Sequence, residues 1–557
     1  MKNRLQGVRS WLFSAIFVAS ATHASPSIPQ PLLDNSVIYC THAQGFSFNP
    51  QRAEAGSNMN VVAEQIFDKL VEFNPRTQQI LPALAERFDV SEDGLTVTFQ
   101  LRKNVPFHHT KWFTPTRQLN ADDVVFSLNR MMGRDDEISE DLAEQESLQR
   151  YQVNKEIADG TYFPYLNSIR LKHRIAHISA TGSHQVTIRL NALYPDLFAH
   201  LASQYAVILS KEYALLLNAD ENSRQFDQLP VGTGVYQLDS YLQNDHIRLK
   251  PNPNYWRKKA KMANMIIDFS TSATGRTAKF LNNECDVVAF PELNQLAVMK
   301  NHGSIRKNAG MNLAFLAFNL QRPQMQNLAL RQQIAQGINR ARLVRTLFYG
   351  SARMANTVLP TGLLLNANQN GYPYFPRPFH KNSAKLTPLN LWVVDEKRVY
   401  NPHPLKMAEL IRFDLARLGI PIQIRQVSQG YLVQQLEKNE ADYDLILGGW
   451  LANNHDLDSF LYPILSCKVQ QSVTNLANWC NAEFDELLNQ AQASRDGAEK
   501  LALYQQAEAL LQKNVPILPL VNADRLLVVS DKLKNVAISP FGQVNLAEIE
   551  RKTEKSQ

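Results

Sequence analysis

The spacing of apolar residues in the second half of the chain predicts a β-α-β unit. The apolar runs at 389–395 and 420–427 have the length of buried strands, and residues 404–418 place apolar side chains on one helical face. Gly419 ends that helix. The right-handed crossover rule makes the two strands parallel if they share a sheet.

The same pattern continues with a helix at 430–438 and a third strand at 443–450. In open parallel sheets, ligands bind outside the carboxyl ends of the strands. Arg398 and Asn453 each follow a strand by three residues, so this topology can bring both to one crevice. The planar guanidinium of Arg398 suits a carboxylate. The alternative role for Arg398 is an ordinary salt bridge at the surface or between lobes.

Elsewhere the hydrophobic pattern alternates between helical and strand-like segments. We expect helices at 60–73, 482–494 and 498–513, and strands at 95–102, 185–190, 235–241, 246–250 and 517–529. Asn120 is followed by two acidic residues in a first turn, which predicts an N-capped helix. The acidic, irregular stretch 134–160 is expected to be a surface insertion, and no internal repeat suggests a solenoid.

Length and charge narrow the class of protein. The 557 residues are 44% hydrophobic and 20% charged, which predicts a large globular chain. At ~100–200 residues per domain, that length allows roughly three domains. The net charge is +6, with basic residues interspersed rather than gathered in an arm. We therefore do not expect nucleic acid as a primary partner.

The N-terminus has the pattern of a secretory signal peptide over residues 1–24. Three basic residues precede a short apolar run at 11–19, and small residues at 22–24 offer a cleavage point. That run is too short to span a membrane, and no cysteine follows it as a lipid anchor requires. We expect export to the periplasm without a lipid anchor, followed by a Pro-rich leader over 25–35.

The four cysteines fit an exported protein. Cys40, Cys285, Cys467 and Cys480 allow three disulfide pairings, and the sequence alone does not choose among them. The chain has no C-x-x-C and no histidine at ligand spacing beside these cysteines. We therefore expect neither a structural zinc site nor a cofactor.

No strong catalytic signature is present. The chain lacks a G-x-S-x-G elbow, an H-E-x-x-H motif and a Walker loop, so we assign no catalytic residue. The lone G-x-G at Gly232–Gly234 is expected to be a tight turn. His108–His109 is expected to be a surface pair. His173 and His177 lie in a strand-like pattern that sets them too far apart to share a metal ion.

Several longer motifs carry a family resemblance. They are Ser91–Arg102, Leu119–Arg130, Gly232–Gly234, Asn252–Trp256, Leu313–Asn319, Arg398–Pro402, Ser466–Cys467 and Asn478–Asn481. In this order, over nearly the whole mature chain, they resemble the periplasmic oligopeptide- and dipeptide-binding proteins of ABC importers, bacterial solute-binding protein family 5. The chain is most similar to the Sap-type members, which are associated with resistance to host antimicrobial peptides.

The resemblance implies an α/β fold, the type II periplasmic binding protein of cluster C, in which two discontinuous α/β lobes close about a hinge and an extra domain packs beside them. The implied division is domain I over 36–70, 200–310 and 525–557, domain II (the extra domain) over 71–199, and domain III over 311–524. A monomer is expected.

The resemblance also implies disulfides and site residues. It pairs Cys40 with Cys285 and Cys467 with Cys480, and it places Arg398 where family members hold the carboxylate of a peptide. The ligand-contacting residues expected are Gly45, Phe46, Arg398, Tyr400, Gly448, Gly449, Trp450, Asn453, Asp456 and Asp458. Peptide-binding members have an aspartate at the position of Asn453, where it pairs with the ligand's ammonium. The amide of Asn453 supplies no counter-charge.

Three functions follow as hypotheses. The first is capture of peptides, cationic host-defence peptides among them, for delivery to an inner-membrane ABC permease. The second keeps the scaffold but takes haem or another non-peptide cargo, since Arg398 is retained and Asn453 is not acidic. The third is an exported hydrolase that uses Asp456 and Asp458 as paired carboxylates, although these two residues can equally cap a loop.

Overall fold

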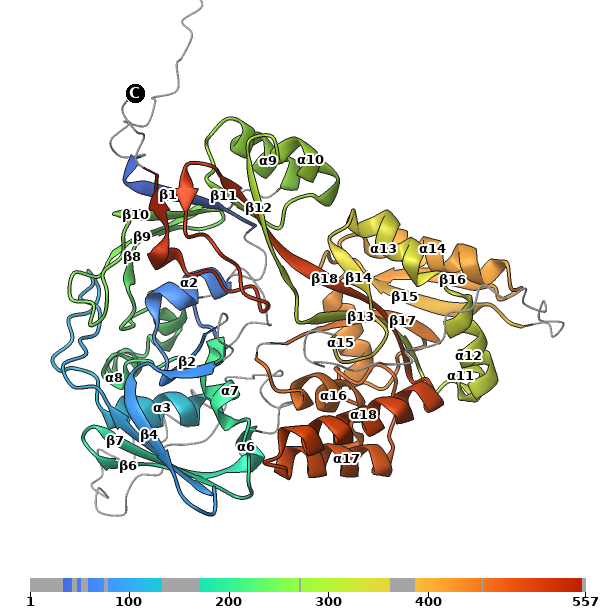
Figure 1. Cartoon of the computed structure of the whole chain (residues 1–557), viewed down its shortest axis with the longest axis horizontal. Coiled ribbons are helices and arrows are strands. Elements are labelled where there is room, and N and C mark those ends of the chain that lie inside the picture. Colours follow the sequence, from blue (N-terminus) through green and yellow to red (C-terminus); the bar gives the residue numbers. More distant parts are fainter. Residues whose placement is uncertain are drawn as a thin grey trace, which may run out of the picture.

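The structure is a computed structural model that describes residues 34–42, 48–51, 59–74, 79–132, 171–269, 272–360, 386–452 and 454–552. The predicted signal peptide and acidic insertion lie outside these residues. The described chain forms two α/β lobes and a smaller four-stranded domain (Figure 1). No helix in the described part is both long enough and apolar enough to cross a bilayer.

The second lobe contains the β-α-β unit that the hydrophobic pattern predicts. β15 (Leu389–Val394) is parallel to β16 (Ile422–Val427), and α14 (Pro404–Ala416) connects them. α15 (Gln429–Glu437) then leads to β17 (Leu445–Leu451), which lies parallel to β15 on its other side. The apolar residues of this unit are buried on both faces of the sheet, as a parallel sheet covered by helices requires.

The rest of the second lobe adds further strands to this sheet and further helices around it. β13 (Asn312–Phe318) runs antiparallel to β17 and is buried along its whole length. The remaining elements are α11 (Pro323–Gln326), α12 (Leu328–Gly337), α13 (Arg340–Phe348), β14 (Ala352–Met354), α16 (Asp458–Leu465), α17 (Ala482–Ala493) and α18 (Gly497–Asn514). The predicted helices near 482–494 and 498–513 are confirmed as α17 and α18.

The first lobe is built on β1 (Ser36–Cys40), which is parallel to both of its neighbours. Its other elements are α2 (Met59–Ile66), β8 (Tyr236–Leu242), β9 (His246–Pro251), β10 (Asn264–Asp268), α9 (Ala273–Leu281), β11 (Val287–Ala289), α10 (Leu296–Met299), β12 (Gly303–Ala309), β19 (Leu533–Lys534) and β20 (Glu550–Arg551). The predicted strands at 235–241 and 246–250 are confirmed as β8 and β9.

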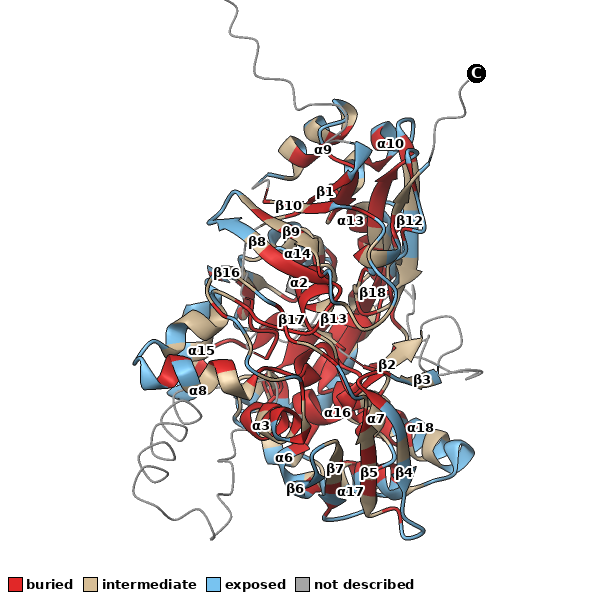
Figure 2. Ribbon diagram, turned by 90° about the vertical axis from the view of Figure 1, so that its left-hand side faces the viewer, coloured by how far each residue is buried: buried red, intermediate tan, exposed pale blue. Residues whose placement is uncertain are grey.

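One long strand, β18 (Ile517–Ser530), belongs to both lobes. Its first half pairs with β13 and β14, and its second half pairs with β11 and β12. A twelve-stranded sheet therefore runs through the molecule, with β18 crossing from one lobe to the other (Figure 1). Residues of β1, β13 and β18 are buried, as Figure 2 shows in red.

The four-stranded domain has the strand order β4-β5-β7-β6. Its elements are β2 (Val71–Asn74), β3 (Gln79–Pro82), β4 (Ala85–Val90), β5 (Thr96–Leu101), α3 (Ala121–Met131), α6 (Leu171–Arg174), β6 (Ile175–Gly182), β7 (Gln185–Leu190), α7 (Leu197–Leu201) and α8 (Lys211–Ala219). Its core also includes Leu201, Tyr205 and Tyr213, from the stretch 200–310 that the implied division assigns to domain I.

The predicted N-cap of α3 is confirmed. Asn120 Oδ1 accepts a hydrogen bond from the Asp122 backbone N–H at 3.1 Å, and the Asn120 backbone N–H donates one to the Asp123 carboxylate at 3.0 Å. This reciprocal pair is a capping box, which satisfies backbone donors that a helix start leaves without partners.

The predicted helix at 60–73 is too long. α2 ends at Ile66, whose carbonyl accepts a hydrogen bond from the Gly234 backbone at 2.9 Å, and residues 71–74 form β2 against β3. A Cβ at Gly232 would stand 2.0 Å from the Ile66 oxygen. The G-x-G turn is therefore required for close packing on α2, and tertiary pairing overrides the local helical period.

The histidine pairs differ from expectation in part. His108 is fully buried rather than on the surface: its Nε2 lies 2.9 Å from the Gly234 carbonyl oxygen, and burial lowers its pKa to about 4. His109 is exposed. His173 lies in the single turn α6 and His177 in β6, so only His177 lies in a strand as expected.

Candidate functional site

Arg398 lies on a tight turn just past the carboxyl end of β15. The backbone groups of Arg398 and Asn401 exchange two hydrogen bonds, at 3.1 and 2.9 Å, and these close the turn. The Arg398 guanidinium lies 2.5 Å from a carboxylate oxygen of Glu396. Since the Arg398 side chain is 28% exposed, the guanidinium is held in place but still reachable from solvent.

Tyr400, on the same turn, packs against the end of β17. A Cβ added to Gly449 would stand 2.1 Å from the Tyr400 ring, so only glycine lets the two approach. Gly448 has a similar constraint, since a Cβ there would lie 2.7 Å from the Phe315 ring. The turn after β15 and the last residues of β17 are thus in contact, as the parallel topology predicts.

The first lobe contributes His42 to the same region. His42 follows β1 by two residues, and its ring centroid lies 5.0 Å from that of Phe290, which follows β11. Burial, followed by the positive charges of Arg276 and Arg398, lowers the pKa of His42 to about 4, so its ring is neutral at neutral pH. His42 is therefore affected electrostatically by a cation of its own lobe and by a cation of the other lobe.

Arg276, on α9, is the cation of the first lobe. It is 4% exposed, and its Nη2 donates to the Phe290 carbonyl oxygen at 3.0 Å. A further ion pair crosses between the lobes: Lys397 Nζ lies 3.3 Å from a Glu292 carboxylate oxygen. Because Lys397 is largely exposed, this ion pair contributes little to stability. It does show that the two lobes lie close together here.

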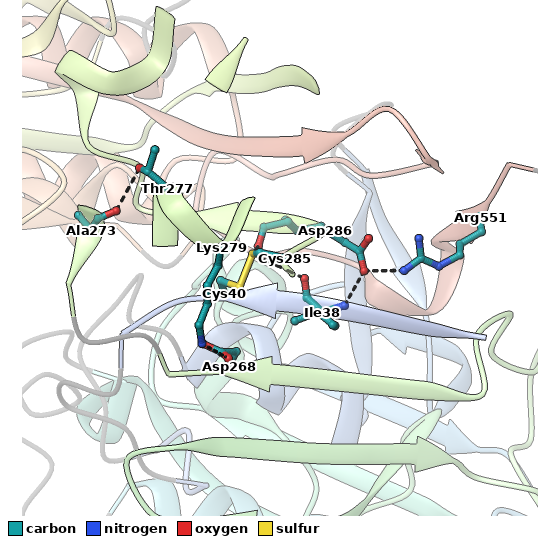
Figure 3. Close-up of a disulfide and its surroundings, with 10 residues drawn as sticks. Ile38, Cys40, Asp268, Ala273, Thr277, Lys279, Cys285, Asp286 and Arg551 are labelled. Atoms are coloured by element: carbon teal, nitrogen blue, oxygen red, sulfur yellow. Dashed lines mark hydrogen bonds and ion pairs between the residues drawn. A yellow bond between two sulfur atoms is a disulfide. The ribbon is translucent and has the colours of Figure 1, made fainter. Parts of the chain in front are cut away.

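A disulfide fixes the first-lobe side of this region. Cys40, the last residue of β1, is bonded to Cys285, with their Cα atoms 6.1 Å apart (Figure 3). Beside it, Asp286 accepts hydrogen bonds from the Ile38 backbone at 2.9 Å and from Arg551 at 2.7 Å. The start of the segment after Cys40 is thereby tied to the base of β11.

The second disulfide joins Cys467 to Cys480 in the second lobe. Both disulfides of the structure are therefore the pairs that the family resemblance implies. Between the two cysteines, Asn475 donates to the Trp479 carbonyl oxygen at 2.9 Å, which closes the loop from inside.

The loop after β17 folds back on α16. The Trp450 indole Nε1 donates to the Ser459 carbonyl oxygen at 2.8 Å. The Asp456 carboxylate accepts a hydrogen bond from the Asp458 backbone at 2.9 Å, which is a loop-capping role. Both aspartates are nearly fully buried, at 2% and 5% exposure.

Asp456 also connects this loop to the four-stranded domain. His200 Nε2 lies 3.0 Å from its carboxylate, the Tyr194 hydroxyl lies at 3.5 Å, and Gln492 donates to it at 3.1 Å. Burial acts to raise the pKa of Asp456, but the hydrogen bond and charge of His200, the charge of Lys500 and the hydrogen bond from the Asp458 backbone together lower it. The Asp456 carboxylate therefore takes part in hydrogen bonds that connect the loop after β17 to the four-stranded domain.

The same network extends on both sides. Asn454 Nδ2 lies 3.2 Å from His200 Nδ1 and 3.3 Å from the Tyr205 hydroxyl. Asp196 pairs with Lys500, but burial and the charge of Asp456 raise the pKa of Asp196 to about 6. The loop after β17 is thus held by side chains from another domain.

The structure brings several predicted site residues together and leaves others apart. Arg398, Tyr400 and Gly449 converge at the ends of β15 and β17, whereas Asp456 and Asp458 are turned into the network between domains. Gly45, Phe46 and Asn453 lie outside the described residues.

Sequence reasoning did not single out three groups that the structure places near the site. The side chains of His42, Arg276 and His200 all come from segments far from the β-α-β unit. The only local signals were the position of His42 after a strand and the charge of Arg276 within a helix. Neither signal reveals the contact with the other lobe. In the described residues, no group of three or more histidine, cysteine or acidic side chains could hold a metal ion.

Two α/β lobes that share one strand and meet at the carboxyl ends of their parallel strands define a type II periplasmic binding protein. The family model described as bacterial extracellular solute-binding proteins, family 5 Middle, matches residues 79–472. The chain belongs to this family.

Individual relatives agree with this assignment. The chain is 43% identical over 534 residues to the "Peptide transport periplasmic protein SapA" of Haemophilus influenzae, covering 94% of each chain. It is 30% identical over 518 residues to the "Heme-binding protein A" of the same species, covering 91% of each. The crystal structure of a dipeptide-binding protein from Pseudoalteromonas sp. SM9913 in complex with Met-Leu is 31% identical, with a TM-score of 0.79, covering 93% of this chain and 100% of that one.

Proposed function

We propose that this protein captures peptides between its two lobes in the periplasm and delivers them to an ABC permease of the inner membrane. The observation that carries the proposal is the position of Arg398, at the carboxyl end of β15 and close enough to His42 of the opposite lobe to lower the pKa of that ring. A ligand bound there touches both lobes, and such a ligand favours lobe closure.

In this proposal Arg398 receives the terminal carboxylate of the peptide. Its planar guanidinium can make two parallel hydrogen bonds to a carboxylate. The pairing of β17 with β15 ends at Leu447, so on that side the backbone at Gly448 and Gly449 has no strand partner in the described chain and can bind a peptide main chain without selecting side chains.

The amino end of the peptide is bound differently here from the way it is bound in family members that have an aspartate at the position of Asn453. Asn453 offers an amide where a carboxylate would neutralise the ligand's ammonium. Burying a charge without its partner costs about 2–5 kcal/mol, so free dipeptides should bind weakly. Longer peptides, whose amino end reaches solvent, avoid this cost.

A second cargo, haem, is favoured by one observation. Arg276 and Arg398 both act electrostatically on His42, and two cations in one crevice suit a ligand with more than one carboxylate. A relative of similar length is named a heme-binding protein. We propose no catalytic activity, since Asp456 is held in hydrogen bonds with neighbouring residues.

The test uses residues 25–557, freed of co-purified ligand by unfolding and refolding. Calorimetry would compare peptides of two to five residues, their C-terminally amidated forms, a cationic host-defence peptide and haem. We expect peptides with a free carboxylate to bind about 10–100-fold more tightly to the wild type than to Arg398→Ala, as the loss of a charged hydrogen bond implies.

Arg412→Ala is the matched control, because Arg412 is half exposed and, among the described residues, forms an ion pair only with Glu409 of its own helix. That variant should bind like the wild type. Equal affinity of the wild type and Arg398→Ala for free peptides would contradict the role of Arg398. Tight haem binding that excess peptide does not displace would replace peptide by haem as the cargo.

A further inference from the structure

Arg525 is a buried cation to which the described chain offers no counter-charge. The side chain is 2% exposed, and its Nε and Nη2 atoms are fully covered without a hydrogen-bond partner in the described residues. Burial alone lowers its pKa to about 10, so the guanidinium remains charged at neutral pH. No acidic residue contributes to that shift.

The position of Arg525 connects it to the region between the lobes. β18 crosses from one lobe to the other (Figure 1). Its pairing with β13 ends at Val521 and its pairing with β11 begins at Leu527, so Arg525 lies between these two pairings, opposite Asn308 of β12. Leu527 is paired with Ala289, the last residue of β11. Arg525 therefore lies just beyond the carboxyl end of β11, at the edge where α/β lobes bind ligands.

The neighbouring acid does not neutralise Arg525. Successive residues of a strand point to opposite faces, and Asp524 faces away toward Lys307 at 3.8 Å and Arg353 at 3.6 Å. Arg525 instead packs against a glycine: a Cβ at Gly542 would stand 3.4 Å from its Cζ. Gly542 has a φ of +91°, which lets the turn bring its backbone this close to the guanidinium.

That turn also borders the loop after β17. Phe541, next to Gly542, packs edge-on against the His455 ring with centroids 4.7 Å apart. The His455 Nε2 is buried without a hydrogen-bond partner in the described chain, and burial lowers the pKa of the ring to about 4. Two buried polar groups without a hydrogen-bond partner in the described chain thus lie beside adjacent residues of one turn, Phe541 and Gly542.

Unpaired buried charge lowers stability, and a core position of this kind is ordinarily filled by an apolar or hydrogen-bonded side chain. Groups that cost stability in this way are characteristic of binding sites, where the ligand supplies the missing partner. The planar guanidinium can bind both oxygens of one carboxylate, and no acidic residue in the described part of the chain affects its pKa.

We propose that Arg525 binds an acidic group of the captured ligand, separate from the carboxylate bound by Arg398. The preferred ligands are then peptides that carry a glutamate or aspartate side chain as well as a free C-terminus. This inference rests on the proposed function, because it assumes that a peptide occupies the space between the lobes.

The experiment compares pairs of peptides of two to five residues that differ only by glutamate against glutamine. The wild type should bind the glutamate member at least about tenfold more tightly for one position along the peptide. In Arg525→Met this preference should fall to about twofold or less, while the affinity for the glutamine peptides stays within twofold. Arg525→Met should also unfold at an equal or higher denaturant concentration, since it removes an unpaired buried charge.

Arg306→Met is the control, because Arg306 is exposed on β12 opposite Leu527. It should keep the full preference. A wild type that binds both members of every pair equally overturns the inference even if no variant folds. An unchanged preference in Arg525→Met overturns it as well. Failure of all peptides to bind the wild type overturns the proposed function itself, and the inference with it.

Discussion

Replacing Asp456 by alanine tests whether the loop after β17 depends on the four-stranded domain. The Asp456 carboxylate is the acceptor shared by His200 at 3.0 Å, Gln492 at 3.1 Å and the Asp458 backbone at 2.9 Å. All of these groups except the Asp458 backbone come from outside the loop. Removing the carboxylate leaves them buried without this acceptor.

The magnitude follows from the number of donors that lose a partner. A buried donor left unpaired costs about 1–3 kcal/mol, and Gln492 keeps a hydrogen bond to the Tyr504 hydroxyl at 3.1 Å. His200 Nε2 and the Asp458 backbone N–H are two further groups that lose this acceptor. We therefore expect Asp456→Ala to lower the free energy of unfolding by about 2–6 kcal/mol.

A double-mutant cycle with His200→Ala isolates the contact between domains. Urea unfolding followed by tryptophan fluorescence would give the stability of the wild type, both single variants and the double variant. Because His200 and Asp456 share one contact, the double variant should be more stable than additivity predicts by at least about 1 kcal/mol. Asp442→Ala is the control, since Asp442 is half exposed in a surface pair and its loss should cost less than about 1 kcal/mol.

Strict additivity of the two substitutions would refute the reasoning, because it would mean that His200 and Asp456 do not interact in solution. A loss below about 1 kcal/mol for Asp456→Ala would also refute it, since the carboxylate would then not be an essential acceptor.

Three further predictions concern other parts of the second lobe. Gly449→Ala should displace the Tyr400 ring, which a Cβ would meet at 2.1 Å, and weaken peptide binding by about 1–3 kcal/mol in calorimetry. Burial raises the pKa of Glu508 from 4.5 to about 7, so ionisation of Glu508 should remove up to about 3 kcal/mol of stability as the pH rises across this range. Glu508→Gln, which cannot ionise, should lose correspondingly less stability between about pH 5 and pH 8 in urea unfolding. Replacing Cys467 and Cys480, 13 residues apart, by serine should lower the free energy of unfolding by about 3 kcal/mol.

Each of these has a control or a contradicting outcome. Gly430→Ala introduces a Cβ with nothing within 4 Å and should leave binding unchanged. Parallel pH profiles of the wild type and Glu508→Gln would show that Glu508 does not titrate differently in the folded state. Equal stability of the wild type before and after reduction would contradict the role given to the Cys467–Cys480 bond.

The regular part of the fold is predictable from the sequence because its signals are local. The β-α-β unit at 389–427 shows its strands as apolar runs and its helix as a one-sided apolar stripe, and the structure confirms each of them. The helix predicted at 60–73 fails at Ile66, where the chain meets the backbone of Gly234 from a distant segment. No local pattern encodes such a contact.

The candidate site also divides into a part that local sequence signals predict and a part that depends on contacts with distant segments. Arg398 could be predicted because its position relative to a parallel strand fixes the edge of the sheet at which it lies. Its neighbours His42 and Arg276 belong to the other lobe, and their approach depends on how the lobes meet. Asp456 was expected near a ligand, but His200, 256 residues away in sequence, engages its carboxylate.

The strand shared by the lobes, β18 at 517–530, also constrains the order in which the chain can fold. Both lobes pair with this strand, which is among the last segments to be synthesised. Until it is present, β11 and β13 each have an open edge, which is a template for pairing with another chain. A chain truncated before Ile517 would therefore leave both lobes incomplete and prone to aggregate, so that a single late segment makes their folding interdependent.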